Sequence, residues 1–222
     1  MRRAMIVLFA SAFVLVQPAL GKPPGPGQSG ATIAAAPNPI VFGSSSSITG
    51  QVTGKKAAGA TVELQSEPFP YKAPFATVGS TTADATGHYS FKVTPGLNTL
   101  YRVTAKTAPS TMSTNVLVKV RVRLSLRVST TRPAAGQLVR FSGFVLPAYN
   151  GRSVQIQRKT ATGWKTVAQA KLVATTPVGG VARSKYSKGV RIPRSGTYRA
   201  WFNPADGARL PKSGPTRRLT VH

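Results

Sequence analysis

The chain has 222 residues, no cysteine, and 30 Lys and Arg side chains against four acids, which gives a formal net charge of +26. The lack of cysteine excludes disulfides, thiol catalysis and cysteine–zinc sites, and so few acids argue against a two-carboxylate active site. The positive field attracts polyanions such as nucleic acid, anionic lipid or acidic polysaccharide, and a compositional bias without a dedicated ligand is the competing interpretation.

The N-terminus has the pattern of a secretory signal peptide. Arg2 and Arg3 precede an apolar run over residues 5–16, and small residues follow before Lys22. This run is shorter than the roughly 20 apolar residues that a membrane-spanning helix needs. The sequence predicts a signal peptide at 1–21, a Pro/Gly-rich linker at 22–30 and no transmembrane span after cleavage. An uncleaved N-terminal anchor is the alternative.

The remainder of the chain contains one unit twice. Gly43 and Gly50 lie seven residues apart, as do Gly136 and Gly143, and residues 59–65 match residues 151–157. A repeat of roughly ninety residues has the size of a small domain. Apolar residues recur with a period of two between short turn segments, which is typical of antiparallel β-sandwiches. We expect domain 1 at 31–122 and domain 2 at 123–222.

The predicted junction between the domains alternates without interruption. Every even position from Val116 to Val128 is apolar, and no Gly or Pro breaks the run. At about 3.3 Å per residue it spans roughly 43 Å, twice the usual strand length. We expect the last strand of domain 1 to continue into the first strand of domain 2 and to couple the domains stiffly. The odd positions carry a basic stripe, either an ordinary solvated face or a polyanion-binding track, formed by Lys119, Arg121, Arg123 and Arg127.

The positive charge is concentrated in the second domain. Residues 122–222 hold nineteen Lys and Arg against one acid, a net +18, whereas residues 22–121 hold nine against three, a net +6. Further candidates for polyanion binding lie in and after the segment 176–187, which we expect to form a longer basic loop. These candidates are Arg183, Lys185, Lys188 and Arg191.

One segment of the first domain has the pattern of a turn that enters a strand. In D-x-x-G-x-Y-S-F at residues 84–91, we expect Asp84 to accept backbone N–H groups and Gly87 to adopt a positive φ. Tyr89 and Phe91 should then face the same side. A calcium site at Asp84 would need more oxygen ligands than the neighbouring sequence offers.

The motifs S-x-T/S-G-x-V, G-x-x-V-x-L/I-Q, W-K-T-V, D-x-x-G-x-Y-S-F and T-x-Y-R together resemble the immunoglobulin-like repeats of exported bacterial proteins, actinobacterial ones especially. They also resemble the regulatory-like sandwich of carboxypeptidases and collagen-adhesin stalks. The resemblance implies an all-β fold of two tandem immunoglobulin-like antiparallel sandwiches with extracellular spacer, adhesion or wall-associated roles. Tyr101 and Tyr198 resemble the tyrosine corner, whose hydroxyl bonds to the backbone.

These features favour a non-catalytic protein, secreted or associated with the cell envelope, whose second domain binds an acidic wall polymer or polysaccharide. No catalytic residue, cofactor or metal is expected, since His88 and His222 offer neither a metal set nor a triad. The alternative is a carbohydrate-binding module in which Trp164 or Tyr149 stacks on sugar rings. Nucleic-acid binding ranks lowest, because no RRM, OB or helix-turn-helix signature accompanies the charge.

Overall fold

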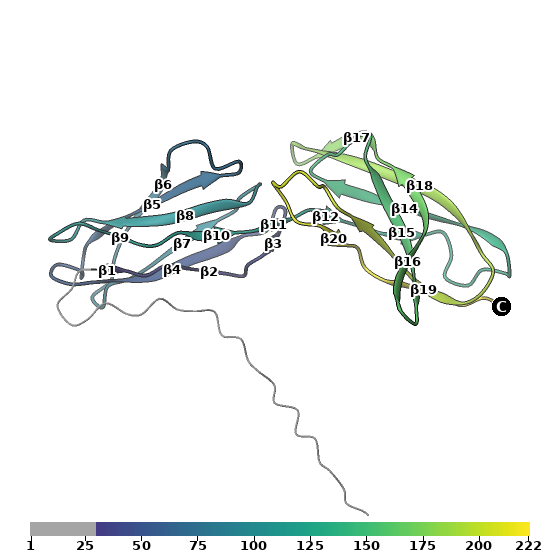
Figure 1. Ribbon diagram of the computed structural model, residues 1–222, viewed down its shortest axis with the longest axis horizontal. Helices are drawn as coiled ribbons and strands as arrows, with labels where there is room; N and C mark the ends of the chain where they lie inside the picture. The colour runs from purple at the N-terminus through teal and green to yellow at the C-terminus, as the bar shows by residue number, and fades with distance from the viewer. Residues whose placement is uncertain (1–29) are drawn as a thin grey trace, which may run out of the picture.

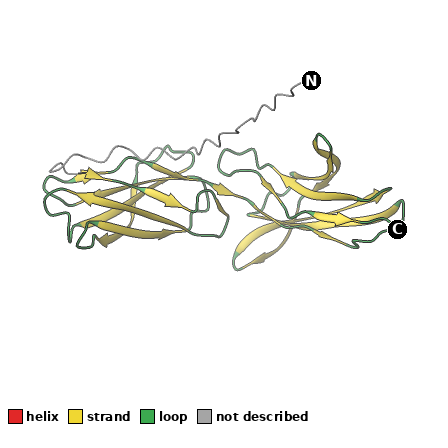
Figure 2. Cartoon of the chain, turned by 90° about the horizontal axis from the view of Figure 1, so that it is seen from below, coloured by secondary structure: helices red, strands yellow, loops and turns green. Residues whose placement is uncertain are grey.

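The computed structural model describes residues 30–222 of the chain. The predicted signal peptide, at 1–21, and all but the last residue of the predicted linker lie outside the described residues. Within 30–222 the protein consists of strands and loops with no helix, as Figures 1 and 2 show. This part of the chain therefore contains no helix that is long and apolar enough to cross a membrane.

The N-terminal half (residues 30–121) is built from two larger sheets and a small one. In the first sheet β4 lies between β1 and β2 on one side and β7 on the other, and the second sheet has the order β10-β8-β5-β6 with β9 also paired to β8. The strands are β1 (Gly30–Ala31), β2 (Ala34–Ala36), β3 (Ile40–Val41), β4 (Ser46–Thr53), β5 (Thr61–Pro68), β6 (Ala76–Thr82), β7 (His88–Val93), β8 (Thr99–Ala105), β9 (Thr111–Met112), β10 (Val116–Val118) and β11 (Val120–Arg121).

The C-terminal half (residues 122–222) repeats the two larger sheets, without a counterpart of the small sheet formed by β3 and β11. One sheet has the order β12-β14-β18-β17 with β13 also on β14, and the other has the order β16-β15-β19-β20 with β21 also on β19. The strands are β12 (Arg123–Leu124), β13 (Arg127–Val128), β14 (Gln137–Leu146), β15 (Ser153–Thr160), β16 (Gly163–Lys171), β17 (Val173–Val178), β18 (Val181–Ile192), β19 (Gly196–Phe202), β20 (Lys212–Ser213) and β21 (Arg217–Leu219).

Each half has its own hydrophobic core between its two sheets. The buried residues of the first core end at Val120, and those of the second begin at Val122. The alternation seen in the sequence sets this arrangement, because successive side chains of a strand point to opposite faces. Along the connecting segment the inward residues are at most 7 % exposed: Val118, Val120, Val122, Leu124 and Leu126.

The connecting segment is not the single long strand that its pattern predicts. It is divided into β10, β11, β12 and β13, which pair in turn with β8, with β3 in parallel, and with β14. Two asparagine side chains replace ladder bonds at the transition. The Lys119 N–H donates to Asn38 Oδ1 at 2.9 Å, and the Val120 N–H donates to Asn98 Oδ1 at 2.8 Å. The chain thus stays extended while it changes partners, because each half has separate sheets.

A loop of the C-terminal half, residues 203–210, lies against the end of the N-terminal half. Asn98 donates from Nδ2 to Gly207 O at 3.0 Å, and its own backbone N–H donates to Ala208 O at 2.8 Å. Arg209 donates to Gly96 O at 2.7 Å. These bonds join two segments more than one hundred residues apart, so the halves meet end to end through direct contacts as well as through the chain (Figure 1).

In the N-terminal half a buried tyrosine closes the first sheet across a glycine. Tyr89 on β7 lies opposite Gly50 on β4, and its hydroxyl donates to the Thr32 carbonyl beyond that glycine. A Cβ on Gly50 would overlap this hydrogen bond, so only glycine fits. Burial raises the pKa of Tyr89, which keeps the hydroxyl protonated as a donor.

The C-terminal half contains the same arrangement. Tyr186 lies opposite Gly143, and its hydroxyl donates to Ser125 O at 2.6 Å. The bond expected of Tyr101 and Tyr198 is therefore made by the preceding tyrosine of each half, and these two rings are instead buried in the two cores. The segment 176–187, expected as a basic loop, is mostly a hairpin of β17 and β18 that carries Tyr186.

The turn at residues 84–91 has the predicted form. Asp84 Oδ1 accepts the backbone N–H of Thr86 at 2.8 Å and that of His88 at 2.9 Å, as well as the Thr86 hydroxyl at 2.7 Å. These bonds lower the pKa of the exposed Asp84 carboxyl. Gly87 has φ of 82°, and both Tyr89 and Phe91 pack on the first core.

Candidate polyanion-binding face

The outer surface of the sheet β12/β13-β14-β18-β17 gathers basic side chains. Val139, Phe141, Gly143 and Val145 of β14 are buried, so the residues between them face outward. Antiparallel pairing brings outward residues of neighbouring strands side by side: Arg127 lies opposite Ser142, which lies opposite Ser187. The basic face is defined by Arg123, Arg127, Arg140, Arg183, Lys185 and Arg191.

Two arginines of the basic face are held by contacts within it. Arg183 stacks on the ring of Phe144, with its Cζ 4.2 Å from the ring centroid, and donates from Nε to Thr176 O at 2.8 Å. Arg140 donates from Nη1 to the Ser187 hydroxyl at 3.3 Å. Their positive charges are thereby positioned before any ligand arrives, which lowers the entropy lost on binding.

None of the four acids of the chain lies in the strands of the basic face. Three of them are engaged elsewhere: Glu63 pairs with Lys106 at 2.9 Å, Asp84 accepts the bonds of its turn, and Asp206 lies 3.8 Å from Arg209. Within residues 30–222, no ion pair involves a cation of the basic face. These charges are therefore compensated only by solvent ions and are available to an external anion.

The structure brings together five of the eight candidate cations predicted from the sequence. Lys119 and Arg121 lie apart, where the chain crosses between the halves. Lys188 lies opposite the buried Phe141 and so points to the inner side of its sheet, at an open flank. Sequence reasoning did not select Arg140, although its place between Val139 and Phe141 is the alternation of a half-buried strand.

Trp164 is covered on one face by an arginine. The Cζ of Arg199 lies 4.1 Å from the ring centroid, and Arg199 donates from Nε to Gln157 Oε1 at 2.8 Å. The N-terminal half repeats the group with Arg102, Phe75 and Gln65 at 4.1 Å and 2.8 Å. Desolvation lowers the pKa of Arg199. Because the same arginine–aromatic contact occurs in both halves, it gives Trp164 a structural role on the sheet surface.

Tyr149 belongs to the junction between the halves. Its hydroxyl donates to Asp206 Oδ2 at 2.7 Å and accepts from Arg209 Nη1 at 3.1 Å, while its ring packs on Phe202. Burial, followed by the bond to Asp206, raises the pKa of Tyr149 to about 12. The Tyr149 hydroxyl and part of its ring are thus engaged in contacts within the protein.

Residues 30–222 contain no group of three or more His, Cys, Asp and Glu side chains placed to hold a metal ion. The chain matches no family model and no curated protein.

Proposed function

We propose that the protein is a non-catalytic, exported tandem of two immunoglobulin-like domains that acts as a spacer or adhesion module of the cell envelope. The repeated Gly–Tyr pair of the two halves supports a duplicated domain, and the sandwich-like packing of antiparallel sheets supports this class of fold. The pattern of residues 1–21 supports export.

The C-terminal half binds an acidic polymer through the basic face. The observation that carries this proposal is the set of six cations on one sheet surface with no carboxylate beside them. Outward residues of adjacent strands lie about 5 Å apart and alternate residues along a strand about 7 Å apart. An extended polyanion can contact several of these cations at once, and bound counterions are then released.

The test is retention of the chain from Lys22 onward on isolated cell envelope and on a polyanion resin over a salt series. By analogy with single-stranded polyanions, six contacts give a slope of log affinity against log salt of about −4. Changing Arg127, Arg140 and Lys185 to serine should weaken retention at every salt concentration and reduce the slope to about −2.

A control variant with the same net charge as this triple variant distinguishes binding by the basic face from attraction by the overall positive charge. Lys159, Lys171 and Arg218 are exposed on strands of the opposite sheet, and their triple change to serine removes three charges elsewhere. It should retain nearly the full slope. Equal loss in both triple variants, or retention that ignores salt, would contradict the proposal.

A further inference from the structure

The C-terminal half has an open cleft between its two sheets. β17 pairs with β18 only as far as Lys185, so the remainder of β18 has a free edge on this side. Between this edge and the sheet of β15, β16 and β19 lies a cleft of about 470 Å³. Its volume falls in the range of small-molecule sites, roughly 300–1,000 Å³.

The cleft is rich in positive charge. Arg158, Lys188, Arg191 and Arg194 line it together with Tyr198, and no acid is among its lining residues. Arg158 lies opposite Tyr198 on the neighbouring strand. Burial raises the pKa of the Tyr198 hydroxyl, while the charge of Arg158, its hydrogen bond to this hydroxyl and the charge of Arg194 oppose the rise.

Arg158 is fixed in place, with donor capacity remaining. Its guanidinium lies over Gly196, where a side chain would clash with it, and Nη2 donates to Ser195 O at 3.1 Å. Its buried Nε–H has no acceptor within residues 30–222. A guanidinium carries five N–H donors, so Arg158 keeps donors on its Nη groups, beyond the bond to Ser195, for an anion in the cleft.

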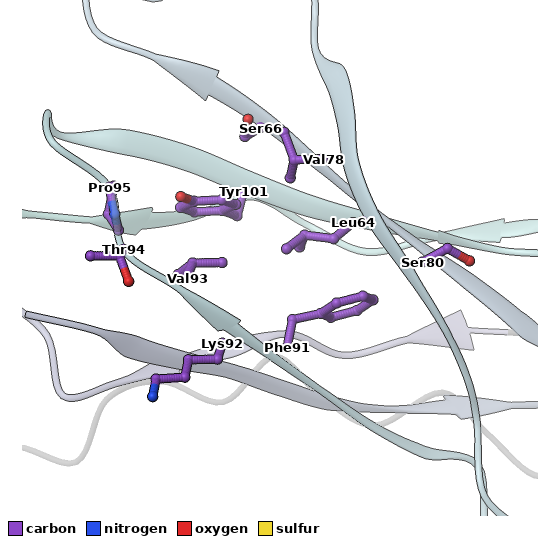
Figure 3. A pocket seen from close by; sticks show the side chains of 11 residues that line it. Leu64, Ser66, Val78, Ser80, Phe91, Lys92, Val93, Thr94, Pro95 and Tyr101 are labelled. Atoms are coloured by element: carbon purple, nitrogen blue, oxygen red, sulfur yellow. The ribbon is translucent and has the colours of Figure 1, made fainter.

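The N-terminal half has the same cleft without the charge. It has a volume of about 380 Å³ and is lined by apolar and hydroxyl side chains with a single lysine, Lys92. In Figure 3, Phe91, Leu64 and Val93 converge on the cleft, while Lys92 directs its ammonium group away from them. The open flank is thus a property of the fold, and its charge is a property of the C-terminal half.

The strand registers show which residues correspond. In the N-terminal half Phe91 follows the paired tyrosine, Tyr89, by two residues and lies opposite Ile48. In the C-terminal half Lys188 follows the paired tyrosine, Tyr186, by two residues and lies opposite Phe141. Lys188 therefore occupies the position that Phe91 has in the N-terminal half. Ser66 lies opposite Tyr101 and Arg158 lies opposite Tyr198, so Ser66 is replaced by Arg158. Two neutral positions of one cleft are cationic in the other, at positions that the shared fold does not require to be basic.

We propose that the cleft of the C-terminal half is a binding site for a phosphate-type oxyanion. Guanidinium groups match the oxygens of phosphate with two parallel N–H···O bonds, and a doubly charged group can engage more than one of the cleft's cations. The phosphate-type group can belong to an acidic polymer or be free phosphate. Only the first of these sources rests on the proposed function. Arg191 borders the cleft, but its register opposite the outward Leu138 directs its side chain to the basic face, so one polymer can reach both.

The experiment is isothermal titration of the chain from Lys22 onward with inorganic pyrophosphate and, separately, with short-chain polyphosphate. Saturable 1:1 binding of pyrophosphate is expected. The variant Arg158→Ser with Lys188→Phe gives the cleft the residues of its neutral counterpart and should weaken binding at least tenfold. A second variant, Lys188→Phe with Arg194→Ser, leaves the Arg158–Ser195 bond intact and should also weaken it, which guards against a folding defect in the first.

The control is the Arg140→Ser, Lys185→Ser pair, which removes two charges from the basic face. It should weaken pyrophosphate binding clearly less than the cleft variants do, since both side chains lie on the outer side of the sheet and the cleft lies on its inner side, and yet weaken polyphosphate. Wild-type protein that binds no pyrophosphate, or equal weakening by cleft and face variants, would overturn the cleft site. Salt-dependent envelope retention would then still support the basic face, so the two proposals fail separately. Tighter binding of polyphosphate than of pyrophosphate identifies a polymer as the source, and equal binding identifies free phosphate.

Discussion

Replacing Asn98 by alanine tests how firmly the two halves are joined. Asn98 is only 7 % exposed, and its amide accepts the Val120 N–H and donates to Gly207 O. Val120 is fully buried, so its N–H would lose its partner without access to water, at a cost of about 1–3 kcal/mol. Gly207 is exposed and its carbonyl can be hydrated, so losing that bond costs about 1 kcal/mol.

The expected loss for Asn98→Ala is therefore about 2–4 kcal/mol in the free energy of unfolding. For a protein of this size, 3 kcal/mol corresponds to a fall in Tm of about 6–12 °C. The assay is differential scanning calorimetry, which also shows whether the two halves begin to unfold in separate transitions.

Asn38 provides the matched control. Its amide makes the same two kinds of bond, accepting the Lys119 N–H and donating to Leu117 O at 2.8 Å, but Asn38 is exposed. Water can replace these bonds, so Asn38→Ala should cost less than about 1 kcal/mol. If both variants lose the same stability, burial at the junction does not set the strength of this contact and the reasoning is wrong.

Two further changes test local contacts, the Gly143–Tyr186 contact in the C-terminal half and the Asp84 turn in the N-terminal half. Gly143→Ala places a Cβ against Ser125 O and 2.8 Å from the Tyr186 hydroxyl, so it should lower the free energy of unfolding in urea by about 2–4 kcal/mol. Gly79→Ala is the control, because its nearest atom is 3.7 Å away, and it should cost less than about 1 kcal/mol. Similar losses in the two variants would contradict the importance of the Gly143–Tyr186 contact. Asp84 has a lowered pKa in the folded protein, so its stabilising effect is present above its unfolded value and is lost as the pH falls through the folded value. Asp84→Asn should therefore flatten the acid limb of Tm against pH below about 4, and an unchanged limb would exclude the turn as its source.

The all-β architecture could be predicted because burial follows a visible pattern. The alternation from Val118 to Leu126 gives the inward residues correctly, since a strand between a core and solvent must place apolar side chains at every second position. The division of this segment into short strands could not be predicted. It depends on Asn38 and Asn98, which are distant in sequence and replace the ladder only when both halves have folded.

The basic face could be predicted in part for a similar reason. In β14, Arg140 lies between buried Val139 and Phe141, and this alternation reveals its outward direction. In β18 the inward residues include the polar Ser184 and the cation Lys188, so the sequence pattern conceals which neighbours face outward. The sequence therefore places Lys188 with Lys185 and Arg183, although its side chain points to the cleft. Only the register with β14 separates the two sets.

The end-to-end arrangement has a mechanical consequence. β1 and β2 run toward the junction beside the oppositely directed β4, and β21 runs away from it beside β19, so the first described strand begins near one far end of the molecule and the last strand points to the other (Figure 1). A pull between these ends acts along the strands, whereas the ladder bonds lie across them. The terminal bonds are then loaded together in shear, not broken one after another as in a zipper, and the extended segment 116–128 transmits the tension between the halves. Because many bonds must break at once, this geometry resists a pull along the strands more than a pull that peels them apart.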